Sequence, residues 1–303
     1  MLLMSWRSFV VVAVLAGSAL SFGQIPGLGK PRVPGLDSIP GLDSIFKKGP
    51  AITTSITDAK YADPAADTFS PAARDLFTLK RGPNGGFLLQ PGTYTATLQS
   101  YCLHAGTHGP TAGDGYLDAP VKGPFHRYVT NVARRSVDHP ELDQHVVQSL
   151  LWALIARAKT SELRGDLGRA ATALLTRDER FEIDGGALGL LSDSRFERAF
   201  GGQPPLLRQI YRAEAQLRSA FAAPDVRFET LERIAVLTGE LAPGLGSANV
   251  PRGRWSKLPL GYSIRFFPSG YSTTRLELTV PENSKAIGTE FDPAEHVAVP
   301  GDT

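Results

Sequence analysis

The stretch of sequence that decides the fold is YSIRFFPSGYSTTRLELTV, residues 262–280. Two extended segments, Tyr262–Phe267 and Tyr271–Val280, flank Pro268-Ser269-Gly270, and a turn of this kind predicts a β-hairpin. In the second segment apolar and polar residues alternate, so one face is apolar and the other carries hydroxyl and charged groups. Such a pair of faces is typical of an antiparallel sheet. The apolar set is Leu276, Leu278 and Val280, and the polar set is Thr273, Arg275, Glu277 and Thr279.

A hairpin alone is marginally stable, so this one needs further strands or a covering helix. The obvious candidate lies far away in the chain, at Tyr94–Cys102, which is rich in threonine and tyrosine and follows the turn signal Pro91-Gly92. Its more apolar alternate residues are expected to face the core, with Cys102 among them. That set is Tyr94, Ala96, Leu98, Ser100 and Cys102, against Thr95, Thr97, Gln99 and Tyr101 on the other face.

Between the two β-rich regions the apolar residues recur at helical spacing. The stretch Val146–Ala158 is apolar almost all round, which predicts a central buried helix that begins near Pro140. The sequence Thr176-Arg177-Asp178-Glu179 fits a capping box at the start of a short helix. Further helices are expected from Phe125, from about Glu162 to Leu175, from Pro204-Pro205, and from about Phe228 to Thr238.

These patterns predict an α+β fold, with a small antiparallel sheet from N- and C-terminal strands and a large inserted helical block. The expected domain covers residues 51–303: it is β-rich at 51–124 and helical at 125–239, and 240–303 form a β-hairpin region. The alternative is two independent β modules on either side of a helical domain.

The first 23 residues have the pattern of a cleaved signal peptide. Arg7 precedes an apolar run, Phe9–Leu20, which is too short to span a bilayer as a helix, and small residues follow at Ser21–Gly23. We therefore expect cleavage after Gly23, with Ser21 as the second choice, and export to the periplasm or the extracellular space. The alternative is an uncleaved membrane anchor. No later stretch is apolar enough to span a membrane, so no integral membrane segment is expected after cleavage.

Residues 24–50 are predicted to be a flexible tether rich in proline and glycine. The unit Pro-Gly-Leu-Asp-Ser-Ile occurs in tandem at Pro34–Ile39 and Pro40–Ile45. Proline every few residues prevents a helix, and glycine after proline favours turns. The alternative is that the regularly spaced leucines and isoleucines form a docking motif for a partner.

Composition and charge narrow the class of protein. The chain is 42% hydrophobic and 20% charged, which is ordinary for a globular protein. Its net charge is +2, and it falls to +1 when cleavage of the signal peptide removes Arg7. The chain therefore lacks the excess of positive charge that is typical of a nucleic-acid-binding protein. Its single cysteine, Cys102, cannot form an internal disulfide. We expect no cofactor, since the chain has no Walker loop, no Rossmann glycine pattern after a strand and no Gly-x-Ser-x-Gly.

One short segment, Tyr101–Pro110, brings together residue types that carry chemistry. It holds Cys102, His104 and His108, and Asp114 follows closely. On a continuing strand Cys102 and His104 would share a face, and an imidazole nearby can make a thiolate available as a nucleophile. Alternatively, a loop could bring His104, His108 and Asp114 together around a metal ion. The third interpretation, which we favour, is structural: a small buried thiol and a tight loop whose histidines bond backbone groups.

Two segments resemble a group of exported bacterial proteins that have no assigned function. They are Pro91-Gly92-Thr93-Tyr94 through Thr107, with Tyr-Cys-Leu-His-Ala-Gly at its centre, and the tail from Arg265 to Pro281 with Asp292-Pro293-Ala294. The resemblance covers most of the chain after about residue 50. It implies no activity and no site residues.

Two functional hypotheses remain open. The favoured one is a non-enzymatic binding or scaffolding protein of the cell envelope or the secreted fraction, whose partner is an envelope protein or a glycan. Trp255, Tyr262, Phe266, Phe267 and Tyr271 are candidates for an aromatic platform, although core packing is the more common role of such residues. The alternative is an envelope hydrolase that uses Cys102 and His104.

Overall fold

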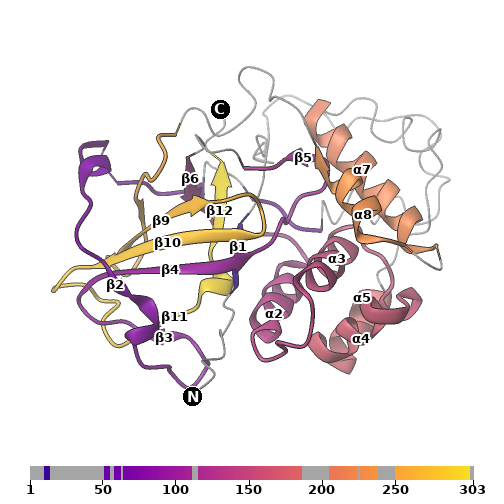
Figure 1. The fold of residues 1–303 in the computed structure, drawn as a ribbon, viewed down its shortest axis with the longest axis horizontal. Helices are drawn as coiled ribbons and strands as arrows, with labels where there is room; N and C mark the ends of the chain where they lie inside the picture. Colours follow the sequence, from indigo (N-terminus) through magenta and orange to yellow (C-terminus); the bar gives the residue numbers. More distant parts are fainter. Residues whose placement is uncertain are drawn as a thin grey trace, which may run out of the picture.

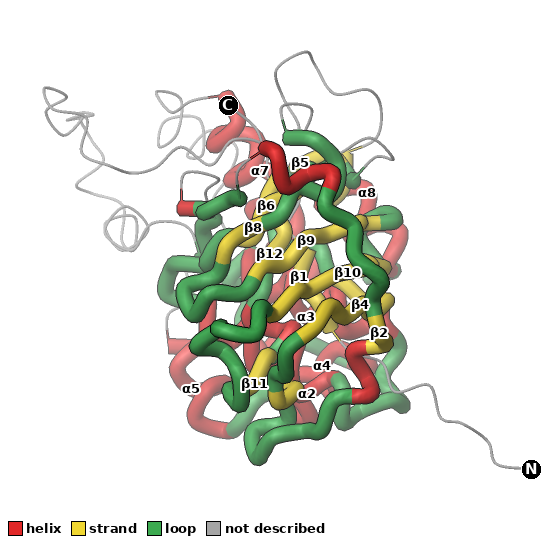
Figure 2. Tube along the Cα trace, turned by 90° about the vertical axis from the view of Figure 1, so that its left-hand side faces the viewer, coloured by secondary structure: helices red, strands yellow, loops and turns green. Residues whose placement is uncertain are grey.

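The computed structural model describes residues 10–13, 51–54, 58–62, 64–110, 115–185, 205–223, 226–237 and 250–300. A β-sheet and a helical block lie side by side (Figure 1). The view in Figure 2 places the strands in front and the helices behind them. The α+β class predicted from the sequence is confirmed.

The principal sheet has eight strands within the described part of the chain. Its centre is antiparallel: β4 (Gly92–Ser100) pairs with β10 (Thr273–Val280), and β10 pairs with β9 (Ser263–Pro268). The β4–β10 register runs from Thr273 opposite Gln99 to Val280 opposite Gly92. Strands from both ends of the chain therefore share one sheet, and the alternative of two independent β modules is wrong.

The remaining strands of this sheet lie on either side of its antiparallel centre. Three of its pairings are parallel, β1 with β4, β1 with β12 and β2 with β4, so the sheet as a whole is mixed. The strands β3 with β11, and β5 with β7, form two small separate sheets. These strands are β1 (Val10–Ala13), β2 (Arg74–Asp75), β3 (Phe87–Leu88), β5 (Thr107–His108), β6 (Tyr116–Asp118), β7 (Val236–Leu237), β8 (Ser256–Lys257), β11 (Glu290–Phe291) and β12 (Val297–Pro300).

Strand β1 lies inside the segment that the sequence predicts to be a leader. It forms a strand between β4 and β12 and runs parallel to both. Cleavage after Gly23 would remove this strand from the sheet. The expected tether, residues 24–50, lies outside the described residues.

The helical block consists of α2 (His126–Ser136), α3 (Gln144–Ile155), α4 (Gly165–Leu174), α5 (Arg177–Gly185), α7 (Pro205–Phe221) and α8 (Phe228–Ala235). The helix α3 is buried from Val147 to Ile155, as its apolar sequence predicts. It begins later than expected from Pro140, because the side chain of Asp143 accepts a hydrogen bond from the His145 N–H (2.7 Å) and caps the helix there. Within the described ranges no helix is both long and apolar enough to cross a membrane.

Two local predictions are confirmed at the level of side chains. Thr176 and Glu179 form the capping box of α5: the Glu179 N–H donates to Thr176 Oγ1 (3.2 Å), and the Thr176 N–H donates to Glu179 Oε2 (2.7 Å). In the hairpin, Leu276 and Leu278 are fully buried, whereas Arg275 on the other face is exposed. The alternating pattern therefore assigns the two faces of β10 correctly.

Candidate functional site

The segment with the cysteine and the histidines leaves the sheet at the end of β4 and enters the interior. Strand β4 ends at Ser100, and residues 101–107 are all buried. Gly106 has a positive φ of 75°, its N–H donates to the Ala235 carbonyl (2.7 Å), and its own carbonyl accepts from Gln209 Nε2 (2.6 Å). A Cβ at this position would lie 2.9 Å from the Cβ of Ala213, so glycine permits the close contact with α7.

Cys102 is fully buried, as expected, but it lies two residues beyond the end of β4, and Tyr101, which was expected on the opposite face, is buried as well. Its thiol donates to the carbonyl oxygen of His104 (Sγ–O 2.9 Å). Burial raises the pKa of the Cys102 thiol to about 11, although this hydrogen bond and the nearby Trp152 indole act in the opposite direction. The thiol is therefore protonated at neutral pH, which is the opposite of what a nucleophilic cysteine needs.

His104 is also buried, and its ring contacts a different partner. Its Nε2 lies 3.2 Å from the hydroxyl oxygen of Thr54. Burial lowers the pKa of His104 to about 4, so the imidazole is neutral at physiological pH. The Cys102 thiol thus bonds to the backbone carbonyl of His104, and the His104 ring contacts the hydroxyl of Thr54. This arrangement matches the structural interpretation of the segment.

The other predicted metal ligands do not assemble into a described site. His108 lies in β5 and is half-buried, and its Nδ1 has no hydrogen-bond partner within the described part of the chain. Asp114 lies outside the described residues. Among the residues that the structure does describe, no group of three histidine, cysteine or acidic side chains is placed to hold a metal ion.

Replacing Cys102 tests the structural interpretation. We expect Cys102→Ser to lower the free energy of unfolding by about 1–3 kcal/mol, because it places a poorly satisfied hydroxyl in a buried site, and Cys102→Ala to cost less. Denaturant melts of both variants measure this. In the folded wild type the thiol should react slowly with an alkylating reagent. Fast labelling of the native protein, with unchanged stability of Cys102→Ser, would show that the thiol is exposed and reactive.

The predicted aromatic platform is divided between the core and the surface. Trp255 and Phe266 are buried, so they cannot contact a ligand. Tyr262, Phe267 and Tyr271 are half-buried. Tyr271 instead donates its hydroxyl proton to Glu232 of α8, and thereby links the hairpin to the helical block.

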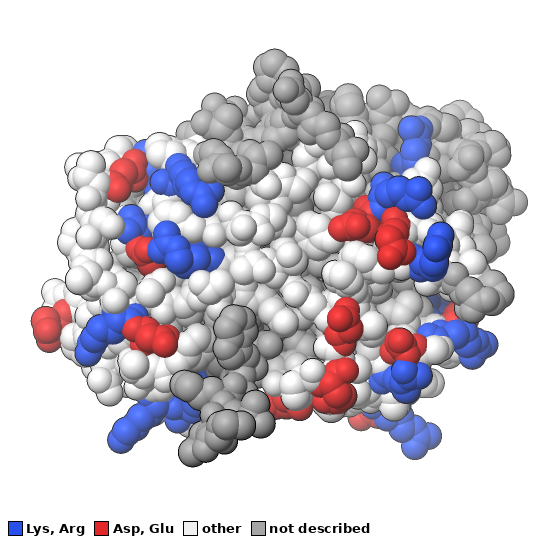
Figure 3. Space-filling view, viewed as in Figure 1, with Lys and Arg blue, Asp and Glu red and all other residues white. Residues whose placement is uncertain are grey.

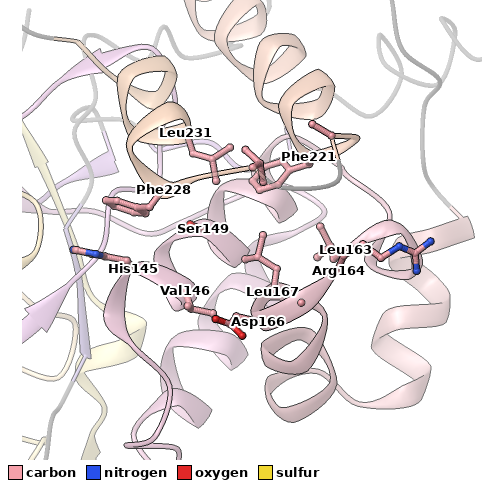
Figure 4. A pocket seen from close by; sticks show the side chains of 13 residues that line it. His145, Val146, Ser149, Leu163, Arg164, Asp166, Leu167, Phe221, Phe228 and Leu231 are labelled. Atoms are coloured by element: carbon pink, nitrogen blue, oxygen red, sulfur yellow. The ribbon is translucent and has the colours of Figure 1, made fainter.

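The helical block contains a pocket that the sequence did not reveal, here called the helical pocket (Figure 4). Its cavity volume is about 380 Å³, which is within the usual size range of small-molecule sites. Side chains of α3 and α4 line one side, and side chains of α7 and α8 line the other. The pocket is lined by His145, Val146, Ser149, Leu163, Arg164, Gly165, Asp166, Leu167, Phe221, Ala223, Val226, Phe228 and Leu231.

The helical pocket is apolar inside and polar at its ends. Leu163, Phe221 and Leu231 are buried; Phe221 and Leu231 lie side by side on the α7 and α8 side of the cavity, and Leu163 lies on the side of α4. At one end the exposed His145 ring stacks on Phe228 with ring centroids 4.1 Å apart. At the other end the Arg164 side chain points away from the cavity. Asp166 also lines the cavity, but its carboxylate pairs with Arg169, so the lining suits an apolar ligand better than a charged one.

No single segment of sequence could reveal this pocket, because its lining comes from separate helices. The available signal was weak: polar or small residues interrupt the apolar faces of these helices, as Ser149 does in α3.

Comparisons of the chain with protein-family models, with curated proteins and with solved structures found no match, so its function has to be inferred from the geometry of its own sites.

Proposed function

We propose that this is an exported bacterial protein of the cell envelope or the secreted fraction, and that it acts as a non-enzymatic binding module. Export is supported by Arg7, the apolar run Phe9–Leu20 and the small residues Ser21–Gly23. The Tyr-Cys-Leu-His-Ala-Gly segment resembles exported bacterial proteins of unknown function, and this resemblance also supports the proposed export. The envelope partner of such a module is a protein or a glycan.

The protonation of the buried segment supports binding over hydrolysis. A hydrolase built on Cys102 and His104 would need an accessible thiolate and a base near it. Cys102 is inaccessible and has a raised pKa, and the His104 ring bonds to Thr54 instead of the thiol. Both groups are therefore better explained as parts of the core.

The observation that carries the proposal is the helical pocket. Its apolar walls would gain free energy by covering a ligand's apolar surface, at roughly 25 cal/mol per Å² removed from water. Its size limits what enters it to a small apolar molecule or to an apolar group of a larger partner, such as a side chain of an envelope protein. Ser149 also lines the pocket, so its hydroxyl is placed to meet a polar atom of the ligand.

Substitution at the mouth of the helical pocket tests this function. Val146 is half-buried and lines the pocket, so Val146→Asn should weaken binding of the apolar dye Nile red about tenfold, because an unpaired amide in an apolar site costs on the order of 1–2 kcal/mol. The increase in dye fluorescence on binding gives the affinity.

Val137→Asn is the matched control for this experiment. Val137 is also half-buried against the core, but it lies at the end of α2 and does not line the pocket. Dye affinity should be unchanged in this variant. Equal affinities in both variants and the wild type would mean that the dye, and by extension an apolar ligand, does not use the helical pocket.

A further inference from the structure

The part of the principal sheet formed by β4, β10 and β9 has a polar face on the side opposite the apolar core. Cross-strand register places Thr97 of β4, Arg275 of β10 and Phe267 of β9 side by side in one row. The next row on the same face consists of Thr95, Glu277 and Arg265. Thr97 and Arg275 are exposed, and Thr95 and Phe267 are half-buried. Lys and Arg side chains lie over β9 and β10 in the space-filling view, beside a broad uncharged area (Figure 3).

Arginine side chains surround the ring of Phe267. The guanidinium carbon of Arg275 lies 3.9 Å from the ring centroid, that of Arg265 lies 5.3 Å away, and that of Arg252 lies 5.7 Å away. Cation–π contacts of this kind hold long side chains in fixed positions at the surface. The guanidinium groups are therefore ordered before any partner arrives, which reduces the entropy that binding would cost.

The charges of this cluster are not balanced at the surface. Arg265 and Arg275 both form ion pairs with the carboxylate of Glu277, so these three side chains together carry one positive charge. The side chain of Glu277 is 11% exposed, whereas that of Arg275 is 43% exposed. The carboxylate of Glu277 therefore lies beneath the surface, and the guanidinium of Arg275 is exposed to solvent.

Exposed aromatic rings adjoin the same cluster. The guanidinium of Arg265 lies 4.2 Å from the centroid of the Trp255 ring, and the ring of Phe69 packs against Trp255 at 6.2 Å. Phe69 is 50% exposed, and Tyr61, next to Arg254, is 54% exposed. An aromatic ring that is open on one face can stack on the apolar face of a sugar.

We propose that this face of the sheet binds a polysaccharide that carries carboxylate groups. Ordered guanidinium groups pair with carboxylates through charge-assisted hydrogen bonds, the hydroxyl of Thr97 can bond to sugar hydroxyls, and Phe69 and Tyr61 offer stacking surfaces. A lipid surface fits less well, because anionic lipids are bound by clusters of several basic residues, whereas Arg265 and Arg275 share the carboxylate of Glu277. This inference does not depend on the helical pocket.

Polygalacturonate, a linear polymer of carboxylated sugars, is the probe for this surface. Affinity electrophoresis of the purified full chain should show retardation by polygalacturonate, little retardation by neutral dextran, and weaker retardation at high salt. Arg275→Gln should weaken binding to polygalacturonate about tenfold, because it removes the most exposed charge-assisted contact. Thr97→Glu, which places a carboxylate opposite Arg275 in the register, should have a similar effect.

Arg169→Gln is the matched control, because Arg169 is an exposed arginine on α4 that also pairs with a carboxylate, that of Asp166. It should bind as the wild type does, and thermal melts establish that all variants fold. Equal binding of polygalacturonate and dextran, or an equal loss in Arg275→Gln and Arg169→Gln, would overturn the proposal. So would co-sedimentation with phosphatidylglycerol vesicles in the absence of binding to the polymer.

Discussion

Replacing Gln148 with leucine is expected to lower the free energy of unfolding by about 2–4 kcal/mol, one of the largest effects of any single substitution in this chain. Gln148 is 1% exposed and lies within the apolar helix α3. Its Oε1 accepts a hydrogen bond from the Cys102 N–H (2.8 Å), and its Nε2 donates to the Cys102 carbonyl (2.9 Å). Leucine is similar in size but can make neither bond, so two buried backbone groups would lose their partner.

Urea unfolding of Gln148→Leu measures this loss directly. Gln209→Leu is the matched control, because Gln209 donates to the Gly106 carbonyl of the same loop but is itself exposed, so that water can replace part of its bond. We expect the control to cost less than about 1 kcal/mol. A cost for Gln148→Leu within that range would mean that the loop does not depend on this amide.

Gln148 also shows how far the sequence predicts the interior. The run Val146–Ala158 correctly predicts a buried helix, and a glutamine inside such a run is a signal that some polar group must meet it in the core. The sequence does not say which group. The partner is the backbone of Cys102, which lies 46 residues earlier in the chain. The pairing depends on where the end of β4 places Cys102 relative to α3.

Local patterns predicted the elements better than their long-range partners. The alternation of apolar and polar residues correctly predicts the two faces of β10, and the turn residues Pro268-Ser269-Gly270 correctly predict the hairpin. Both features depend on residues that are neighbours in the sequence. The parallel pairings of β1 and β2 with β4 were not predicted, because short strands carry little pattern and their position is fixed by contacts elsewhere. The helical pocket was missed for the same reason, since residues from separate helices line it.

The other large effect is expected at Glu214, a carboxylate buried in α7. It is 5% exposed, and burial raises its pKa to about 7, with Arg218 and Arg157 opposing this shift. Tyr211, on the same helix, interacts with it electrostatically. The folded protein therefore holds a proton on Glu214 at a pH where the unfolded chain, with an ordinary pKa of 4.5, has released it.

The sign of the pH dependence follows from this difference in bound protons. Below the unfolded pKa both states are protonated, and the contribution of Glu214 to stability is fully present. As the pH rises from 4.5 towards about 7 the folded state binds the extra proton, so stability falls, and above the folded pKa the loss is complete. His104 acts in the opposite direction: its lowered pKa, about 4, means that stability is lost as the pH falls below 6.5.

Glu214→Gln isolates the carboxylate from these other groups. The stability of Glu214→Gln minus that of the wild type should rise by on the order of 3 kcal/mol between about pH 5 and about pH 8, because the amide cannot ionise while the wild type must bury a charge. His104 is present in both proteins, so its contribution cancels in the difference. Glu162→Gln is the matched control in urea melts across the same range, because the Glu162 side chain is 59% exposed and stays in contact with water in the folded protein. A flat difference for Glu214→Gln would mean that this carboxylate is ionised in the folded protein throughout, with Arg157 and Arg218 outweighing the effect of burial.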